Sequence, residues 1–286
     1  MRGGQWQALY LLKGLAERGH RVRLLAPAGS PLASAAAAQQ LEVRPLRLNA
    51  LVAAARDADL IHAHDARAHT LAVLTGRPAI VSRRVAFPVR RNLASRWKYR
   101  RAAHFIAVSD CVRRTLMEAG VDPGRITVVY DGILLPEPAQ ASRTRVVAVD
   151  LDDPGKGKKL IERAGKLAGV PIRFSTNLPQ DLPEAAVFVY ITDSEGLGSA
   201  VLLAMAYCAP VLASAVGGLP EIVEDGVTGL LTPNDPATIA NSIRRLLSDS
   251  ALASRLAAHA RARVETKFSV DRMVDETVRV YERTLS

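Results

Sequence analysis

The sequence predicts an α/β fold with two Rossmann-like, doubly wound domains that face a cleft. Short apolar, β-rich runs alternate with helix-like segments along the chain, and continuous apolar strands are typical of parallel sheets covered on both faces. The 286 residues are 49% hydrophobic, which is enough for two cores. In such sheets, ligands bind at the carboxyl ends of the strands, so we expect the functional residues there.

Ten runs carry the strand pattern, five in each half of the chain. They are residues 20–27, 60–64, 78–84, 104–109 and 126–132, followed by 145–150, 170–175, 186–192, 209–214 and 229–233. The proline-rich stretch 136–144 is the best candidate for a linker. We therefore expect an N-terminal domain over residues 1–140 and a C-terminal domain over 141–268. Residues 269–286 have apolar side chains at helical spacing, which predicts a final amphipathic helix.

The positive charge is concentrated in the first half of the chain. Residues 1–140 hold 21 Lys and Arg against 10 Asp and Glu, whereas residues 141–286 hold 17 against 18. A one-sided field indicates an anionic partner: nucleic acid, a phosphorylated acceptor or an acidic membrane surface. No apolar run has the length of a membrane-spanning helix, and the start lacks the apolar core of a signal peptide. We expect a cytoplasmic protein, in contact with the inner face of the cytoplasmic membrane if the partner is a lipid.

The most basic stretch, residues 83–101, holds eight Lys and Arg interleaved with Phe87, Trp97 and Tyr99. This interleaving suits single-stranded nucleic acid, a membrane interface or a plain solvated face. We favour the membrane over nucleic acid. The predicted patch for a membrane or an anionic acceptor consists of Arg90, Arg91, Arg96, Trp97, Lys98, Arg100 and Arg101.

Three glycine-containing turns could bind an anion, because free backbone amides and the helix dipole favour negative charge at a helix N-terminus. Gly3 and Gly4 precede a helical pattern. In "TDSEGLGSA" (192–200), an apolar strand ends, Asp193 and Ser194 offer capping oxygens, and Glu195 stands between them and two glycines. The alternative for this turn is a simple helix cap with a solvated glutamate.

The third turn, "DDPGKGKKLIERA" (152–164), places lysines around two glycines but lacks the spacing of a Walker loop. A lysine in this turn could still neutralise a diphosphate. "HAHD" (62–65) follows a predicted strand, and its two histidines lie on one side of that strand. These histidines could bind a metal, have a structural role or make polar contacts in the cleft.

Five stretches, in order, resemble the GT-B glycosyltransferases of the large retaining group called family 4 (group 1). They are residues 2–27, 57–65, 104–133, 195–235 and 268–285. The resemblance implies sugar transfer, with retention, from a nucleotide-sugar donor to a lipid-linked or lipopolysaccharide-like acceptor. It also implies that the C-terminal domain binds the donor and that the final helix crosses back to the first domain. Neither a metal nor a cofactor is expected, since the nucleotide-sugar is a substrate and Lys, Arg and helix dipoles neutralise the diphosphate.

The resemblance also implies roles for individual residues. Glu195 contacts the sugar, Lys156 binds the donor phosphate, and Gly3 and Gly4 lie near the diphosphate. The turn that supplies amides to the donor is formed by Gly196, Leu197 and Gly198. Possible sugar or acceptor contacts are His62, His64, Asp65, Arg83 and Arg84.

The sequence departs from the family pattern in two residues and two segments. Leu203 stands where the family has a second glutamate for the ribose, and Leu151 replaces an arginine that binds phosphate. The donor domain is shortened between residues 175 and 186. The strand expected before Gly3 is absent from the sequence, which leaves open a start upstream of Met1. These departures favour an alternative hypothesis, a non-catalytic GT-B scaffold that binds a glycan, a lipid or a protein.

Overall fold

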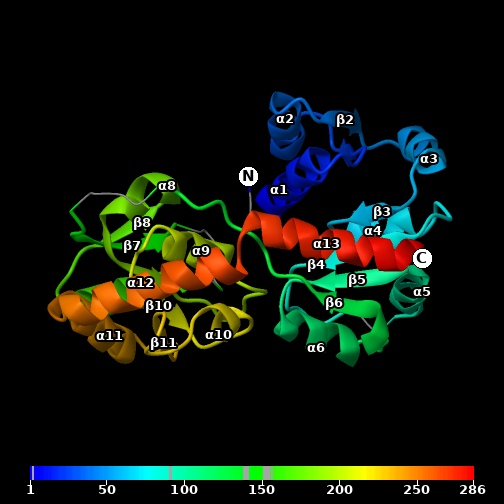
Figure 1. Cartoon of the computed structure of the whole chain (residues 1–286). Coiled ribbons are helices and arrows are strands. Elements are labelled where there is room, and N and C mark those ends of the chain that lie inside the picture. Colours follow the sequence, from blue (N-terminus) through cyan, green and yellow to red (C-terminus); the bar gives the residue numbers. More distant parts are fainter. Residues whose placement is uncertain (2, 90–91, 138–141, 151–154, 156) are drawn as a thin grey trace. The chain divides into compact units, whose positions relative to one another are not determined.

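The structure, a computed structural model, describes residues 1, 3–89, 92–137, 142–150, 155 and 157–286. The chain forms two compact units: unit 1 is Met1–Gly132 with Val270–Ser286, and unit 2 is Ile133–Ser269 (Figure 1). The α/β prediction is confirmed, and each of the ten predicted runs contains a strand. The division falls eight residues before the predicted boundary, because the Ile133 amide already donates to the Phe268 carbonyl within unit 2 (2.8 Å).

Unit 2 contains a five-stranded parallel sheet with the order β11-β10-β9-β7-β8. The chain winds outward from β7 in both directions, so the loops after β7 and β9 meet where the strand order reverses. The strands are β7 (Arg145–Val149), β8 (Ile172–Ser175), β9 (Ala185–Tyr190), β10 (Val211–Ser214) and β11 (Leu230–Thr232). This reversal is where a doubly wound sheet offers a ligand-binding crevice.

Helices cover both faces of the unit 2 sheet. Alternate strand residues such as Val146 and Val187 share an apolar core with Ile161 and Ile243 from two of the helices. The α-helices are α7 (Lys158–Ala168), α8 (Leu178–Asp181), α9 (Ser199–Ala206), α10 (Leu219–Ile222), α11 (Pro236–Ser248) and α12 (Ser250–Lys267). Helix α7 packs on α11, and α9 packs on α12. Asp235 and Asp249 cap α11 and α12 by accepting backbone N–H bonds.

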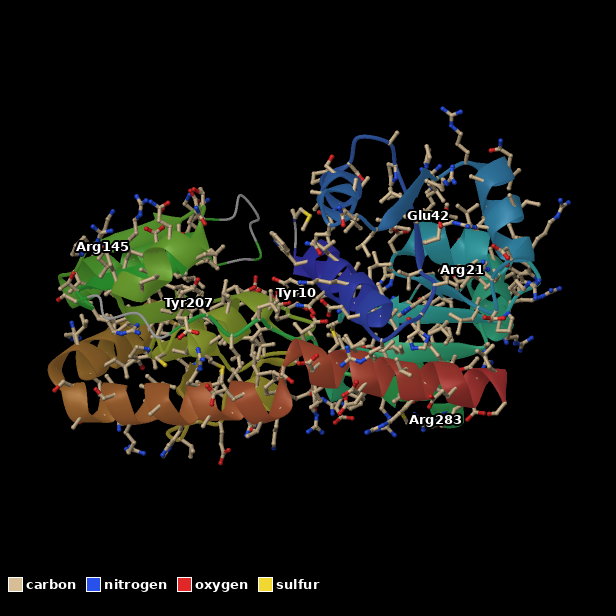
Figure 2. All side chains as sticks on the ribbon, turned by 45° about the horizontal axis from the view of Figure 1, so that its top comes forward. Tyr10, Arg21, Glu42, Arg145, Tyr207 and Arg283 are labelled. Carbon is tan, nitrogen blue, oxygen red and sulfur yellow. The ribbon has the colours of Figure 1, made fainter. Side chains whose placement is uncertain are left out.

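Unit 1 contains a four-stranded parallel sheet, β3-β4-β5-β6, and a two-stranded parallel sheet, β1-β2. The strands are β1 (Arg23–Ala26), β2 (Glu42–Pro45), β3 (Ile61–Ala63), β4 (Ala79–Arg83), β5 (His104–Ala107) and β6 (Ile126–Val128). Strand β2 was not predicted. Arg21 and Glu42 (Figure 2) form ion pairs around the smaller sheet, with Asp57 (2.8 Å) and Arg23 (2.7 Å) respectively.

Seven α-helices of unit 1 surround these sheets in the described part of the chain. They are α1 (Gly3–Glu17), α2 (Pro31–Ala38), α3 (Leu48–Arg56), α4 (Ala66–Ala72), α5 (Leu93–Arg101), α6 (Asp110–Glu118) and α13 (Val270–Leu285). The last helix packs on the first, and both contribute side chains to one core: Leu11 and Leu15 from α1, Val274 and Val280 from α13. The two helices lie so close at Gly14 that an added Cβ would overlap the Val274 side chain.

The ion pairs of Arg18 add to this contact. Its guanidinium binds Asp271 (3.2 Å) and Asp275 (2.8 Å) of α13. The predicted final amphipathic helix is therefore a structural part of unit 1. No helix in the described ranges combines the length and the apolar character needed to cross a bilayer.

Candidate functional site

Each unit gathers polar side chains at the carboxyl end of its parallel sheet. We call the group in unit 2 the Glu195 cluster; it comprises Asp150, Gly155, Lys158, Tyr190, Thr192, Asp193, Glu195, Ser214, Gly217, Gly218 and Asn234. We call the group in unit 1 the Arg84 cluster; it comprises Gly3, Gly4, Gln7, His62, His64, Ser82, Arg84, Asp131, Gly132 and Tyr281.

Glu195 is held in a defined orientation in the turn after β9. Its Oε2 accepts a hydrogen bond from the Tyr190 hydroxyl (2.5 Å), and its Oε1 accepts one from the Gly196 amide (3.0 Å). Tyr190 is 7% exposed and stands at the end of β9, so a buried side chain supports a half-buried carboxylate. The sequence analysis did not single out Tyr190. The signal available was a tyrosine that ends an apolar strand five residues before the glutamate.

Two glycines after β10, Gly217 and Gly218, pack directly against the backbone of the same turn. The Gly218 amide donates to the Glu195 carbonyl oxygen (3.1 Å), and Gly217 has a φ of +58°. An added Cβ at Gly217 would overlap that carbonyl, and one at Gly218 would overlap the Gly196 carbonyl. These glycines are therefore required for close backbone packing that fixes Glu195.

We expect Gly217→Ala to destabilise unit 2 more than the matched change Gly226→Ala. Both glycines have positive φ, but Gly226 faces open space. The conformational cost, about 1 kcal/mol, is common to both variants. The overlap at Gly217 should add about 1–3 kcal/mol. Hydrogen exchange of the β10 amides measures the effect, and equal loss of protection in the two variants would contradict the packing role.

A hydrogen-bond network joins the ends of β9, β10 and β11 beneath this turn. Asn234 donates from Nδ2 to the Thr192 carbonyl (3.0 Å) and to Asp193 Oδ1 (3.1 Å), and it accepts from the Ser214 hydroxyl (2.6 Å). The Asp193 amide donates to the Gly155 carbonyl (3.0 Å), which joins the loops after β7 and β9. The predicted cap is wrong: α9 begins at Ser199, its N-cap residue is Gly198, and no side chain within the described residues caps it; Asp193 is bound to Asn234 instead.

The remaining predicted residues of unit 2 have varied surroundings. Gly196 and Gly198 are buried, and Leu197, 2% exposed, packs into the core instead of pointing to a ligand. Lys156 lies outside the described residues. The neighbouring Lys158 is bound to Asp150 (2.5 Å) and lies over the Phe174 ring. Leu203 lies on α9 and is half-buried.

The Arg84 cluster combines a buried cation with the N-terminus of α1. Arg84 follows β4, its side chain is 17% exposed, and it forms an ion pair with Asp131. The Arg84 Nε atom is buried without a hydrogen-bond partner in the described part of the chain. Burial lowers the pKa of Arg84 to about 10, so the guanidinium stays charged at neutral pH. Gly4, in the first turn of α1, lies beside it: an added Cβ would be 3.4 Å from Arg84 Cδ.

The first turn of α1 is fixed to the loop after β6 by one side chain. Gln7 donates from Nε2 to the Gly132 carbonyl (2.9 Å) and accepts from the Gly132 amide (3.0 Å). The first amides of a helix have no acceptor within the helix, so the turn at Gly3 and Gly4 favours an anion. These amides and the Arg84 guanidinium are therefore groups that could hold an anion.

The two histidines of the cluster lie ring against ring, tilted by 36°, and are held neutral. Their ring centroids lie 4.1 Å apart, and His62 bonds Tyr281 (2.6 Å) and Ser82 (2.8 Å) through its two ring nitrogens. Burial, and then the charge of Arg84, lowers the pKa of His64 to about 3; burial and then His64 lower that of His62 well below its usual value. His64 Nδ1 is buried and has no partner among the described residues. It can therefore donate to, or accept from, a ligand hydroxyl.

Two further residues that were predicted to contact the sugar or the acceptor, Asp65 and Arg83, are bound to groups within unit 1. The Asp65 carboxylate caps α4 by accepting from the Arg67 and Ala68 amides (both 2.8 Å). Arg83 donates to the Tyr99 hydroxyl (3.1 Å) and to the Phe87 carbonyl, so it supports the loop after β4. Among the described residues, no group of three or more His, Cys, Asp and Glu is arranged to hold a metal ion.

Several solved structures share this fold. Anabaena HepE, crystallised with UDP-glucose, matches 99% of this chain and 96% of its own with a TM-score of 0.85 and 18% identity. Sucrose-phosphate synthase from Thermosynechococcus elongatus matches 96% of this chain and 91% of its own with a TM-score of 0.70, also at 18% identity. At these identities the likeness shows the fold, which is GT-B.

Sequence comparisons show the family. A model described as glycosyltransferase family 4 matches residues 1–135, and one described as glycosyl transferases group 1 matches residues 138–249. The chain therefore belongs to the family 4 (group 1) glycosyltransferases.

Curated relatives match part of the chain. D-inositol 3-phosphate glycosyltransferase of Streptomyces bingchenggensis is 36% identical over 155 residues, which are 50% of this chain and 34% of the relative. Alpha-maltose-1-phosphate synthase of Mycobacterium tuberculosis is 36% identical over 113 residues, 37% of this chain and 29% of the relative. The matched region thus spans about a third of the length of these curated relatives.

Proposed function

We propose that this protein is a glycosyltransferase that moves a sugar from a nucleotide-sugar donor to a lipid-linked, lipopolysaccharide-like acceptor. The observation that carries the proposal is the fixed carboxylate of Glu195 at the strand reversal of unit 2, bound by Tyr190 and supported by the Gly217 turn. A rigid carboxylate at this position accepts hydrogen bonds from sugar hydroxyls. HepE, which has the same fold, was crystallised with UDP-glucose, so a UDP-sugar is the first donor to test.

In this proposal, the residues divide into sugar-orienting and charge-neutralising groups. Glu195 orients the transferred sugar, and Tyr190 acts through Glu195 as a positioning residue. The amides of the α1 first turn and Arg84 bind an anionic phosphate group. Lys156 retains its predicted role as a phosphate ligand. His64 offers a neutral ring nitrogen to a hydroxyl of the sugar or the acceptor.

We also propose that transfer occurs with retention of the anomeric configuration. The acceptor hydroxyl attacks the anomeric carbon on the face from which the diphosphate departs. The carbon–oxygen bond to the phosphate breaks, the new glycosidic bond forms, and a phosphate oxygen of the leaving group takes the hydroxyl proton. The protein stabilises the negative charge on the departing diphosphate with amide dipoles and cations.

Titration with nucleotide-sugars tests the proposed function. Calorimetry with UDP-glucose, and then with GDP- and ADP-sugars, should detect binding of at least one donor, and product analysis should detect its turnover. Leu203 favours the alternative of a non-catalytic binding scaffold, because a leucine cannot hold ribose hydroxyls. If none of the donors binds, the transferase proposal is wrong and the scaffold alternative replaces it.

We expect Glu195→Gln to lower kcat/KM for the accepted donor by about 10- to 100-fold, since a charged hydrogen bond to the sugar contributes about 1.5–3 kcal/mol. Tyr190→Phe should have a smaller effect in the same direction, because it removes only the group that orients Glu195. Tyr207→Phe is the matched control in unit 2 (Figure 2): Tyr207 is half-buried, and its backbone carbonyl accepts a hydrogen bond from Arg143 (2.7 Å). Equal rates for Glu195→Gln and the unmodified protein would remove Glu195 from the site.

A further inference from the structure

Helix α5 presents a separate surface that the Arg84 and Glu195 clusters do not use. Leu93, Arg96, Trp97, Arg100 and Arg101 are spaced three and four residues apart, so they share one face of this helix. They line an open hollow of about 570 Å³. We call these five residues the α5 surface.

The apolar members of this surface are exposed, and α5 contacts the rest of unit 1 through its other side, although none of its nine described residues is fully buried. Leu93 is 82% exposed and Trp97 is 41% exposed. The other side of α5 packs against the rest of unit 1. The Tyr99 ring stacks on Phe105 (5.3 Å between centroids), and Lys98 Nζ donates to the Ala66 carbonyl (3.2 Å). The exposure of Leu93 and Trp97 therefore belongs to an ordered face and does not reflect a loosely packed helix.

The loop before α5 extends the apolar character. Val85 is 45% exposed and Phe87 is 64% exposed. A solvent-exposed leucine, tryptophan, phenylalanine and valine within thirteen consecutive positions are costly in water unless a partner covers them.

The polar members of the surface are cations without acidic partners. Helix α5 contains no Asp or Glu. Within the described ranges, Arg96, Arg100 and Arg101 form no ion pair with a carboxylate, and Arg101 lies over the Trp97 ring at 5.5 Å. The three guanidinium groups can therefore bind external phosphates.

We propose that the α5 surface docks on an anionic lipid bilayer, with Leu93 and Trp97 in the headgroup region and the three arginines on lipid phosphates. Arginine beside tryptophan and leucine on one helix face is typical of helices that lie in a membrane interface. Charge complementarity selects the anionic lipid. The most exposed apolar residue of the surface is aliphatic, and Leu93 offers no ring on which a base could stack, so a bilayer fits better than RNA.

The inference deepens the proposed function, on which its biological meaning rests: docking would bring the protein to a membrane that holds a lipid-linked acceptor. The binding experiment contains no donor and no acceptor. Failure to bind vesicles would therefore overturn the docking proposal alone, whereas failure to bind any nucleotide-sugar would overturn the transferase proposal alone.

The test is cosedimentation of the full chain with two kinds of vesicles, phosphatidylcholine alone and phosphatidylcholine mixed with phosphatidylglycerol. We expect binding to the mixed vesicles, weakened by salt, and little binding to phosphatidylcholine. The variant Arg96→Gln/Arg100→Gln/Arg101→Gln should bind about 100-fold more weakly, at roughly fivefold per arginine. Leu93→Gln/Trp97→Gln, which keeps the charges, should lose about tenfold or more.

A control with the same loss of charge is Arg163→Gln/Arg245→Gln/Arg255→Gln, three exposed residues of unit 2. It should bind the mixed vesicles nearly as well as the unmodified protein. Equal weakening of this control and the α5 variant would reduce the effect to net charge and overturn the proposal. Tight, salt-dependent binding of an RNA oligonucleotide, without vesicle binding, would also overturn it.

Discussion

Replacing Asp131 by alanine is expected to lower the free energy of unfolding of unit 1 by about 3–5 kcal/mol. Arg84 and Asp131 form a largely buried ion pair, with side chains 17% and 9% exposed. Removing the carboxylate leaves the Arg84 charge buried without its partner, beside an Nε that already has none in the described part of the chain. Urea unfolding followed by tryptophan fluorescence measures the loss, because Trp6 and Trp97 both lie in unit 1.

The matched control removes both charges. In Arg84→Met/Asp131→Leu the buried cation is absent, so most of the lost stability should return, since a buried pair contributes little net free energy over apolar side chains of similar size. Nucleotide-sugar binding should not return with it, because Arg84 is the proposed phosphate ligand. A double variant as unstable as Asp131→Ala would show that Asp131 acts through packing and not by neutralising Arg84.

Mild acid is expected to destabilise unit 1 through its histidines. The pKa of His64 falls from an ordinary value of 6.5 to about 3 on folding, so between these values the unfolded chain binds more protons than the folded one. Stability is therefore fully present above pH 6.5 and is lost as the pH falls below it. For His64 alone the loss at pH 5 is about 2 kcal/mol. His62, whose pKa is also lowered well below 6.5, adds to it.

The control isolates these two histidines from others that titrate in the same direction. Burial lowers the pKa of His69 to about 4 and also lowers that of His104, both in unit 1. Urea unfolding at pH 7.5 and pH 5, monitored by tryptophan fluorescence, should show a smaller pH dependence in His62→Gln/His64→Gln than in the unmodified protein. The same pH dependence in both proteins would mean that His62 and His64 are solvated or charged when folded.

The sequence was sufficient to predict ten of the eleven strands that the structure describes but not the contacts between distant elements. All ten predicted runs contain strands, because buried parallel strands are continuous apolar runs that composition reveals. Strand β2 was missed because "EVRP" alternates charged and apolar residues and ends in proline, and its burial is only partial. A short two-stranded sheet leaves a weak sequence signal.

In the candidate sites, too, single residues could be predicted from the sequence, but their partners could not. Glu195 could be predicted from its turn, but its orientation depends on the close approach of Gly217 to the Glu195 backbone. Such a contact between two loops has no signature in the sequence of either loop alone. Likewise, the pairing of Arg84 with Asp131, 47 positions apart, depends on β4 and β6 ending at the same edge of the sheet. Residue types and strand ends are local properties, whereas partners are properties of the fold.

The placement of α13 in unit 1 has a consequence for synthesis on the ribosome. Unit 2 is formed by one continuous segment, Ile133–Ser269, whereas unit 1 needs Val270–Ser286 in addition to the first 132 residues. The apolar side chains of α1 that share a core with Val274 and Val280 are covered only after all of unit 2 has been synthesised. Unit 2 can therefore complete its core first, while apolar side chains of α1 remain uncovered during that interval.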